Sequence, residues 1–292
     1  MITVRVPATS ANLGSGFDCF GLALSLYATV SFARSERLKI EGCPLEFQNE
    51  TNLVYVAYTH TLKTLGLPAE PVNITISSSI PIARGLGSSA ALLVAGVLGA
   101  NAMHGSPLDR QRCLAICNEL EGHPDNVSPA LFGGCVASVL HENQPIAIPF
   151  IVHPSLCVLA LIPDFELSTS LSRSVLPQTV AFKDAVFNGS RSAILGKAME
   201  TGNAEWLAIA TQDRLHQPYR KGLIPDFDVI RSIVMNAGAN AFFISGAGPT
   251  LLCIYTDPGF ADRVKDALIN THAHWTCQTL DIDKQGATLR FK

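Results

Sequence analysis

The sequence predicts a mixed α+β fold divided between two domains, and three observations support this prediction. The chain has 292 residues, more than a single hydrophobic core usually needs. Segments with the alternating pattern of strands are interleaved with segments of helical spacing. Their order has neither the regular period of a barrel nor an internal repeat. A proline-rich, weakly charged stretch at 145–154 marks the expected boundary, which divides the chain into 1–152 and 153–292.

The expected elements of the N-terminal part begin with two strands. Residues 1–32 alternate like strands around a turn-rich interruption at 11–18. Helical spacing over 52–65 follows Thr51, a residue that can cap a helix. The β-branched, alternating residues 72–76 predict a strand, and the run of Ala, Leu, Val and Gly over 90–102 predicts a buried helix.

A second amphipathic helix is expected over 108–120, opened by Ser106-Pro107 as a cap followed by proline. The polar turn 121–126 interrupts it, before an apolar stretch at 127–140 that contains a Gly-Gly pair. Residues 156–162 then predict a buried strand. The remaining expectations are helices over 178–200, 203–215, 227–237 and 260–271, and strands over 241–245, 251–255, 276–282 and 286–291.

The composition is typical of a compact soluble enzyme, with 48% hydrophobic and 15% charged residues, and excludes a disordered protein. A net charge of −3 and a pI of about 6.2 give no reason to expect binding to nucleic acid or to anionic membranes. No apolar run approaches the roughly 20 residues that span a bilayer. Residues 1–7 look like a strand rather than a signal peptide, so a cytoplasmic protein is expected. The eight cysteines contain no CxxC pair, which favours reduced thiols over zinc ligands.

The stretch 81–91 has the pattern of a phosphate-binding loop that runs into a helix. Gly85 and Gly87 allow a tight turn and a close approach to a ligand. Ser88 and Ser89 stand at the helix start, where free N–H groups and the helix dipole attract anions. The alternative is an ordinary strand–turn–helix with a serine cap. The loop is not a Walker motif, because it contains no lysine.

A triphosphate in this loop would bring a divalent cation, which needs carboxylate or hydroxyl ligands. Glu119 and Glu121 lie at the end of the preceding helix, where glutamates are usually only solvated. These two, however, adjoin a turn that carries the polar residues His123, Asp125 and Asn126.

Two other glycine clusters and two arginines are candidates for a substrate site. The segments 12–18 and 245–250 could be an Asx-type turn and a hairpin turn, although Asp18 is unusual between apolar neighbours. Arg173 and Arg220 stand beside prolines in apolar surroundings. A guanidinium group suits a carboxylate ligand, but each arginine alone is more often a structural salt-bridge partner.

The motifs 7–18, 81–91 and 245–250 occur together and in order, and they resemble the kinase superfamily of galactokinase, homoserine kinase, mevalonate kinase and phosphomevalonate kinase. Within it, Leu120–Val127 and Gln217–Arg220 resemble the homoserine kinase family. The resemblance covers nearly the whole chain. One departure is Ser15, where the family usually carries proline, which should alter loop stiffness more than chemistry.

The resemblance implies the GHMP kinase fold. The domain at 1–152 would be like the second domain of ribosomal protein S5, the domain at 153–292 would be ferredoxin-like, and the active site would lie between them. It also implies transfer of the γ-phosphoryl group of ATP to the hydroxyl of L-homoserine, giving O-phospho-L-homoserine for threonine biosynthesis, with Mg²⁺ as cofactor. Family members are often homodimers.

The resemblance further implies roles for individual residues. Asp18 would hold the homoserine ammonium, the two arginines its carboxylate, and Asn126 with His123 its hydroxyl. The full homoserine site would be Asn12, Asp18, His123, Asn126, Arg173 and Arg220. The ATP phosphates would be wrapped by Pro81, Ile82, Ala83, Arg84, Gly85, Leu86, Gly87, Ser88, Ser89, Ala90 and Ala91.

Mg²⁺ would be held by Ser89 and Glu121, with Glu119, two residues earlier, as the alternative. The catalytic group would be Asn126, His123 and Asp125. Asp125 and His123 are second-rank proton acceptors, because direct transfer without a strong base is favoured in this family. Two other functions stay open. A mevalonate-type kinase needs no ammonium receptor, and a catalytically silent regulator would be expected to lose the serines or the acidic ligand.

Overall fold

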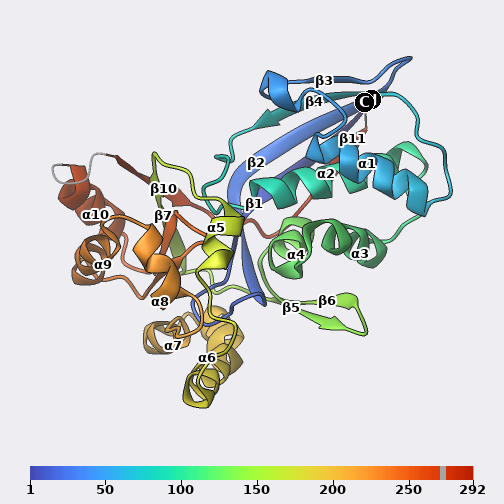
Figure 1. Cartoon of the computed structure of the whole chain (residues 1–292). Coiled ribbons are helices and arrows are strands. Elements are labelled where there is room, and N and C mark those ends of the chain that lie inside the picture. The colour runs from blue at the N-terminus through green and yellow to red at the C-terminus, as the bar shows by residue number, and fades with distance from the viewer. Residues whose placement is uncertain (270–273, 292) are drawn as a thin grey trace.

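The computed structural model describes residues 1–269 and 274–291, and it contains two β-sheets with helices packed against each (Figure 1). The first sheet has seven strands, in the order β11-β1-β2-β4-β3, with β5 joined to β2 and β6 to β5. These strands are β1 (Ile2–Ala11), β2 (Phe20–Arg34), β3 (Lys39–Glu41), β4 (Val72–Ser78), β5 (Cys135–His141), β6 (Gln144–Phe150) and β11 (Thr288–Phe291).

The long strand β2 organises this sheet. It pairs with β1 along its length, with a register shift between Pro7 and Ala8, and its second half pairs with β4. Its first residues, 20–22, pair instead with β5. All pairings are antiparallel except the one between β3 and β4. The opening motif at 12–18 therefore lies in the turn between the two central strands.

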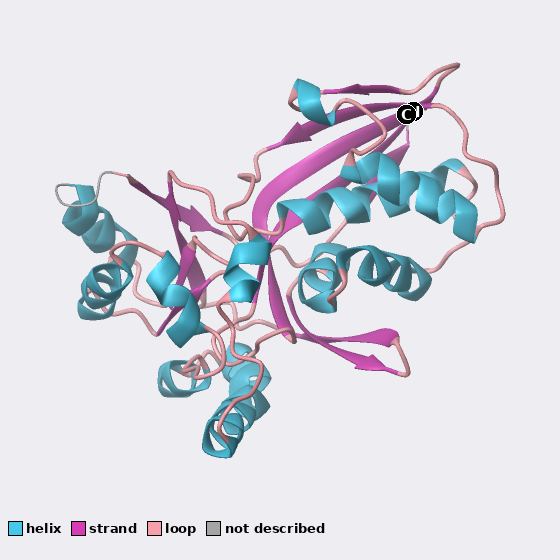
Figure 2. Cartoon of the chain, in the orientation of Figure 1, coloured by secondary structure: helices cyan, strands magenta, loops and turns pink. Residues whose placement is uncertain are grey.

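Four helices cover this sheet, and α2 is buried at their centre (Figure 2). Gly96 and Gly99 allow its close packing, because a Cβ at either position would overlap the Val54 carbonyl or the Phe32 ring. The strongly apolar composition of α2 thus reflects contact on every side rather than on one face. The helices are α1 (Leu53–Thr64), α2 (Ser88–Met103), α3 (Arg110–Glu121) and α4 (Pro124–Phe132).

The second sheet is antiparallel, in the order β10-β7-β9-β8, and is buried on both faces. Val158 and Ala160 of β7 point into the main core, whereas Leu159 and Leu161 point into a smaller apolar cluster. This alternation is the period of two that strands impose. The strands are β7 (Cys157–Pro163), β8 (Ala241–Ile244), β9 (Leu251–Tyr255) and β10 (Trp275–Leu280).

Helices of the C-terminal half pack against both faces of the second sheet. Residues of α6 and α7 join the main core, and residues of α9 and α10 form the smaller cluster on the opposite face of the sheet. The helices are α5 (Thr169–Ser174), α6 (Phe182–Thr201), α7 (Ala204–Ala210), α8 (Gln217–Arg220), α9 (Phe227–Asn236) and α10 (Phe260–Ile269), with 3₁₀ turns at Leu45–Phe47 and Lys221–Leu223.

The C-terminal segment returns to the first sheet. β11 pairs with β1, and the carbonyls of Asp281 and Asp283 accept hydrogen bonds from Ser25 and Gly134. The division at 152/153 stays a prediction, and the last strand of the chain lies in the sheet of the N-terminal half.

The predicted α+β class is confirmed, but several boundaries and caps differ from expectation. Asn52, not Thr51, caps α1 by accepting a hydrogen bond from the Val54 N–H. Asp109, not Ser106, caps α3. In both cases the better acceptor is the residue immediately before the first helical position.

The helix expected at 203–215 ends at Ala210, where the Ser15 hydroxyl donates to the Ala210 carbonyl at 2.7 Å. The helix expected at 178–200 begins only at Phe182. The apolar stretch 127–140 is divided by Gly133 and Gly134, which both have positive φ, into the end of α4 and the start of β5. Of the helix expected at 260–271, positions 270 and 271 lie outside the described residues.

All eight cysteines are free thiols. Within residues 1–269 and 274–291, no helix combines the length and the apolar composition that crossing a membrane would need.

Candidate active site

The glycine-rich loop presents its N–H groups to a cavity because its carbonyls are engaged elsewhere. Gly85 and Gly87 both adopt left-handed φ, and Gly87 is the N-cap of α2. A Cβ at Gly87 would overlap the Thr9 hydroxyl, so glycine is required there. The loop carbonyls of Ala83, Arg84, Gly85 and Leu86 accept hydrogen bonds from Leu167, Thr250, Ser245 and Thr9.

The N–H groups of Gly85, Leu86 and Gly87 donate to no other residue within 1–269 and 274–291. The first N–H groups of α2 also lack partners within the helix. Together with the positive end of the helix dipole, these donors have the arrangement that an anion-binding site needs, and the phosphate-binding role of the loop stays a prediction.

A hydroxyl and a carboxylate meet at the mouth of α2. The Ser89 hydroxyl donates to Glu121 Oε2 at 3.0 Å. Glu121 is the last residue of α3, and Gly122 ends the helix in a left-handed conformation. Burial raises the pKa of the Glu121 carboxyl. Glu119 points elsewhere, toward His60 at 3.2 Å, and is 67% exposed. Of the two glutamates, only Glu121 contacts the loop.

The turn after α3 places three polar side chains beside the loop. His123 Nδ1 lies 2.8 Å from Asp125 Oδ1, and this hydrogen bond raises the pKa of His123. The Asp125 carboxylate is only 1% exposed. Asn126 accepts a hydrogen bond from the Thr9 hydroxyl of β1 at 2.8 Å. Pro124 occupies the first turn of α4, where it needs no hydrogen-bond partner for its nitrogen.

On the opposite side, the opening motif meets α5. Asn12 accepts a hydrogen bond from the Asp18 N–H at 2.8 Å and donates to the Gly246 carbonyl at 3.0 Å. Asp18 forms a two-pronged ion pair with Arg173, at 2.7 and 3.2 Å. Asp18 accordingly raises the pKa of Arg173. The sequence predicted roles for both residues but not that they pair with each other.

Arg220 is a buried cation with an unused donor. Its Nε donates to the Ser172 carbonyl and its Nη1 to the Gly246 carbonyl, at 3.2 and 3.0 Å. Its Nη2 makes no hydrogen bond with any described residue, and the side chain lines the cavity. Burial, followed by the nearby charge of Arg173, lowers the pKa of Arg220 to about 10. An anionic ligand beside Arg220 would offset the free-energy cost of burying its positive charge.

The third glycine cluster, at 245–250, is a hairpin turn between β8 and β9 and also part of the site wall. The Ser245 hydroxyl donates to the Gly85 carbonyl at 2.6 Å, and the Gly246 N–H donates to the Ala11 carbonyl at 2.9 Å. The turn therefore joins the phosphate loop to the opening motif.

One cavity of about 120 Å³ brings these groups together. It is lined by every residue predicted for a site except Asp18, Ile82, Ala90 and Ala91. Asp18 adjoins it through Arg173, and Ala90 and Ala91 are buried in α2. Thr169 lines it without having been predicted, and Gly246 and Ala247 belong to the candidate segment 245–250.

Sequence reasoning also missed the support beneath Arg220. The Asp213 carboxylate is closed to solvent and accepts hydrogen bonds from the N–H groups of Leu215, His216 and Gln217 and from the Asn188 amide. It thereby caps α8. The available signal was an acidic residue shortly before Gln217-Pro218, a typical helix start.

His216 links the segment held by Asp213 to two residues of the site, Gly14 and Arg220. Its Nε2 lies 2.8 Å from the Gly14 carbonyl, and its Nδ1 lies 3.4 Å from Arg220 Nη1. Burial lowers the pKa of His216, so the ring is neutral, donates to Gly14 and accepts from Arg220. Its ring also stacks on Phe17, with 5.2 Å between centroids.

We expect Asp213→Asn to raise the KM for the amino-acid substrate by about tenfold or more, because an amide cannot accept all four hydrogen bonds and α8 loses its cap. The KM for nucleotide should change little, since Asp213 contacts no part of the loop. Asp184→Asn, which disturbs only a surface pair with Arg214, is the matched control. Equal losses in both KM values would instead indicate general unfolding.

Comparisons with known proteins give matches along most of the chain. The models of the GHMP kinases N terminal domain and of the GHMP kinases C terminal domain match residues 52–134 and 195–274. A homoserine kinase of Caldicellulosiruptor saccharolyticus is 43% identical over 99% of the chain and 96% of its own length, and one of Picosynechococcus is 42% identical over 99% of each.

Solved structures give the same result. A homoserine kinase of Cytophaga hutchinsonii superposes with a TM-score of 0.87 at 27% identity, covering 99% of this chain and 97% of its own. A protein described as a putative homoserine kinase of Listeria monocytogenes reaches 0.83 at 32% identity over both whole chains. A mevalonate kinase, at 14% identity with a TM-score of 0.72 over 97% of this chain and 99% of its own, shares the fold.

Proposed function

The chain belongs to the homoserine kinase family of the GHMP kinases, and from this membership we propose how its residues carry out the reaction. The reaction is the transfer of the γ-phosphoryl group of ATP to the side-chain hydroxyl of L-homoserine, giving O-phospho-L-homoserine for threonine biosynthesis. We further propose that it takes place in the cytoplasm, where ATP is available.

One observation carries the assignment of roles. The N-terminal end of α2 and the side chain of Arg220 line the same cavity. We assign the β- and γ-phosphates of ATP to the N–H groups of the loop and of α2. The transferring group would then lie between the loop and the first turn of α4, which carries Asn126.

Mg²⁺ fits the oxygen ligands at the mouth of α2. The hydroxyl of Ser89 and the carboxylate of Glu121 are adjacent, and hard cations such as Mg²⁺ prefer such ligands together with phosphate oxygens. A site of few protein ligands is typical of Mg²⁺ bound with a nucleotide. When bound, the ion neutralises charge on the phosphates. Glu121 would orient it, and Ser89 would fix the position of Glu121.

Homoserine is a zwitterion, and the pair of Asp18 and Arg173 has the complementary charges. We propose that the ammonium group binds Asp18 while the carboxylate binds Arg173 and the free Nη2 of Arg220. One internal ion pair is thus exchanged for two charge-assisted contacts with the substrate. Asn12 would hold Asp18 in place through the hydrogen bond from the Asp18 N–H.

The hydroxyl of homoserine would be oriented by Asn126 and His123. Because the transition state of phosphoryl transfer is loose, positioning and charge neutralisation supply most of the rate acceleration, and no strong base is required. The hydrogen bond to Asp125 raises the pKa of His123, and whenever its ring is protonated His123 would contribute positive charge near the transferred group and could not act as a base.

We expect Asn126→Ala to lower kcat by about 100-fold and Asp125→Asn by about tenfold or less, since Asn126 touches the substrate whereas Asp125 acts through His123. NMR titration of the His123 ring should show a lower pKa in Asp125→Asn, because the hydrogen bond that the ring donates to Asp125 is the largest cause of its raised value. An inactive but correctly folded Asp125→Asn enzyme would contradict the scheme without a base.

A coupled assay of ADP release tests the function itself. The enzyme should turn over with L-homoserine and not with mevalonate or galactose, which lack the ammonium group that Asp18 would hold. Turnover of either alternative at a comparable kcat/KM would overturn the assignment.

A further inference from the structure

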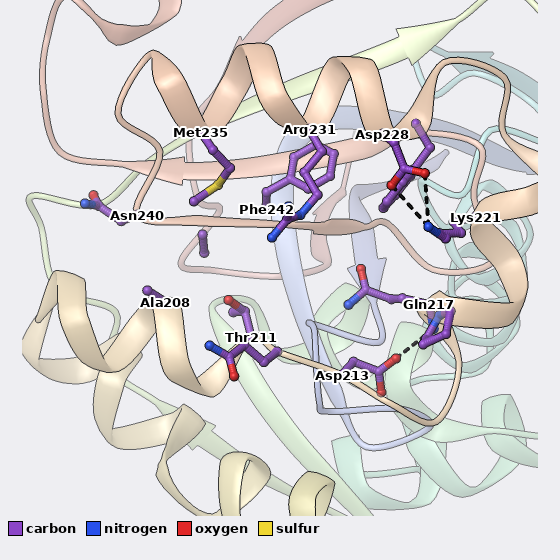
Figure 3. Close-up of a pocket in the computed structure, with 14 residues that line it drawn as sticks. Ala208, Thr211, Asp213, Gln217, Lys221, Asp228, Arg231, Met235, Asn240 and Phe242 are labelled. Atoms are coloured by element: carbon purple, nitrogen blue, oxygen red, sulfur yellow. Dashed lines mark hydrogen bonds and ion pairs between the residues drawn. The ribbon is translucent and has the colours of Figure 1, made fainter. Parts of the chain in front are cut away.

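A second cavity lies in the C-terminal half of the molecule. It has a volume of about 520 Å³ and is bounded by α7, the segment 211–221, α9 and β8 (Figure 3). It shares no lining residue with the cavity of the active site. A volume of this size is within the range of pockets that bind small molecules, roughly 300–1,000 Å³.

The floor of this cavity is apolar and aromatic. Phe227 and Phe242 pack with 5.4 Å between ring centroids, and Met235 and Ala208 extend the apolar surface. Both phenylalanines are nearly buried, at 8% and 9% exposure, so their positions are fixed by the surrounding core. Such a floor favours a ligand with an apolar body.

The charges on the walls leave one cation available. Lys221 Nζ pairs with both oxygens of Asp228, at 3.0 and 3.2 Å, and the Asp213 carboxylate is saturated with hydrogen bonds. Arg231 forms no hydrogen bond or ion pair with any residue that the structure describes. Its side chain descends from α9 toward Phe242 in Figure 3.

A second donor lies on the opposite wall. The carboxamide oxygen of Gln217 accepts a hydrogen bond from the Ile244 N–H at 3.0 Å, which fixes the orientation of the amide. The NH₂ group of Gln217 has no partner among residues 1–269 and 274–291. A guanidinium group and an amide NH₂ around an apolar floor are the donors that a carboxylate needs.

We propose that this cavity binds a small organic carboxylate with an apolar body. Arg231 and Gln217 hold the carboxylate, and the body lies against Phe227 and Phe242. A single free cation matches one negative charge, so a phosphate monoester, with a charge between −1 and −2 at neutral pH, is bound less well.

The occupied cavity acts on the active site through its wall, a consequence that rests on the proposed function. Gln217 is the first residue of α8 and Arg220 is the last, and Asp213 caps the same helix. A ligand that binds the Gln217 amide therefore acts on the helix that carries Arg220. The ligand should change the KM for homoserine and leave the KM for ATP unchanged.

NMR titration of the full-length protein with phenylacetate tests the binding site without any turnover. We expect saturable shifts of the Gln217 and Phe242 resonances, weaker binding of phenyl phosphate, and none with phenylacetamide, which has the same body without the charge. Arg231→Met should weaken phenylacetate binding by about tenfold or more. The matched control is Arg37→Met, because Arg37 is also exposed and its side chain has no partner within the described residues.

The proposed carboxylate site would be contradicted if phenylacetate did not bind, or if it bound equally well to the Arg231→Met variant. Equal or tighter binding of phenyl phosphate would overturn its preference for carboxylates. Saturating phenylacetate should shift the homoserine KM of the wild-type enzyme by about twofold or more and that of Arg231→Met not at all. Binding without such a shift would remove the link to α8 only. If the proposed function were wrong, the enzyme would not turn over homoserine, yet phenylacetate would still bind in the second cavity. The two failures are therefore distinguishable.

Discussion

Replacing Arg220 by methionine should lower kcat/KM for homoserine by about 100- to 1,000-fold, with most of the loss in KM. Arg220 is buried, and its free Nη2 is the donor that the account gives to the substrate carboxylate. Loss of one partner of a buried, hydrogen-bonded charge pair costs about 2–5 kcal/mol, or about 30- to 5,000-fold, and the expected loss lies within that range. Steady-state kinetics with homoserine and ATP varied in turn measure the effect.

The KM for ATP shows whether Arg220 acts by binding homoserine or only by stabilising the structure. Arg220 also holds the carbonyls of Ser172 and Gly246, so the variant should be somewhat less stable. Its ATP KM should nevertheless stay within about threefold of the wild-type value, because the loop is anchored through Ser245 and Thr9 instead. Arg214→Met, which removes a surface ion pair with Asp184 and a cation–π contact with Phe187, is the matched control. A homoserine KM that Arg220→Met leaves unchanged would contradict the account.

Glu121→Gln should lower kcat by about 100-fold and raise the Mg²⁺ concentration needed for half-maximal rate, because the amide keeps the shape of the side chain but not its charge. Glu119→Gln is the control, since Glu119 lies on the same helix, is largely exposed and faces His60. It should alter both quantities by less than about twofold. Similar losses in the two variants would contradict the assignment of Glu121.

The same variant should show that Glu121 lowers stability in the ligand-free protein. Burial raises its pKa in the folded state, so folding favours the protonated form and disfavours the ionised one. At pH 7 the ionised carboxylate therefore costs stability, and Glu121→Gln should have a Tm equal to or above that of the wild type. The difference should shrink as pH falls through the raised pKa, because the protonated carboxyl then resembles the amide.

The local features of this site could be predicted from the sequence because they depend on a few neighbouring residues. Gly85 and Gly87 are needed where the backbone adopts left-handed φ, and Ser89 follows at the start of a helix whose alanine and leucine residues are buried on all sides. The same holds for the turn at His123, where Pro124 and a preceding glycine indicate the end of one helix and the start of the next.

Contacts between distant residues could not be predicted in this way. No local pattern indicates that Arg173 pairs with Asp18, 155 positions away, or that the Arg220 side chain is held by two backbone carbonyls. The helix expected to continue to 215 ends at Ala210, where the Ser15 hydroxyl binds its carbonyl. Ser15 thereby anchors the opening loop at the position where the family usually has proline.

The central claim is that the cavity holds homoserine by both charges of its amino-acid group. Calorimetric titration of the wild-type protein, saturated with Mg²⁺ and a non-hydrolysable ATP analogue, tests it most directly. We expect one homoserine bound per chain and no measurable binding of homoserinol, which has the ammonium and hydroxyl groups but no carboxylate. Homoserinol binding with an affinity near that of homoserine would contradict the role given to Arg173 and Arg220.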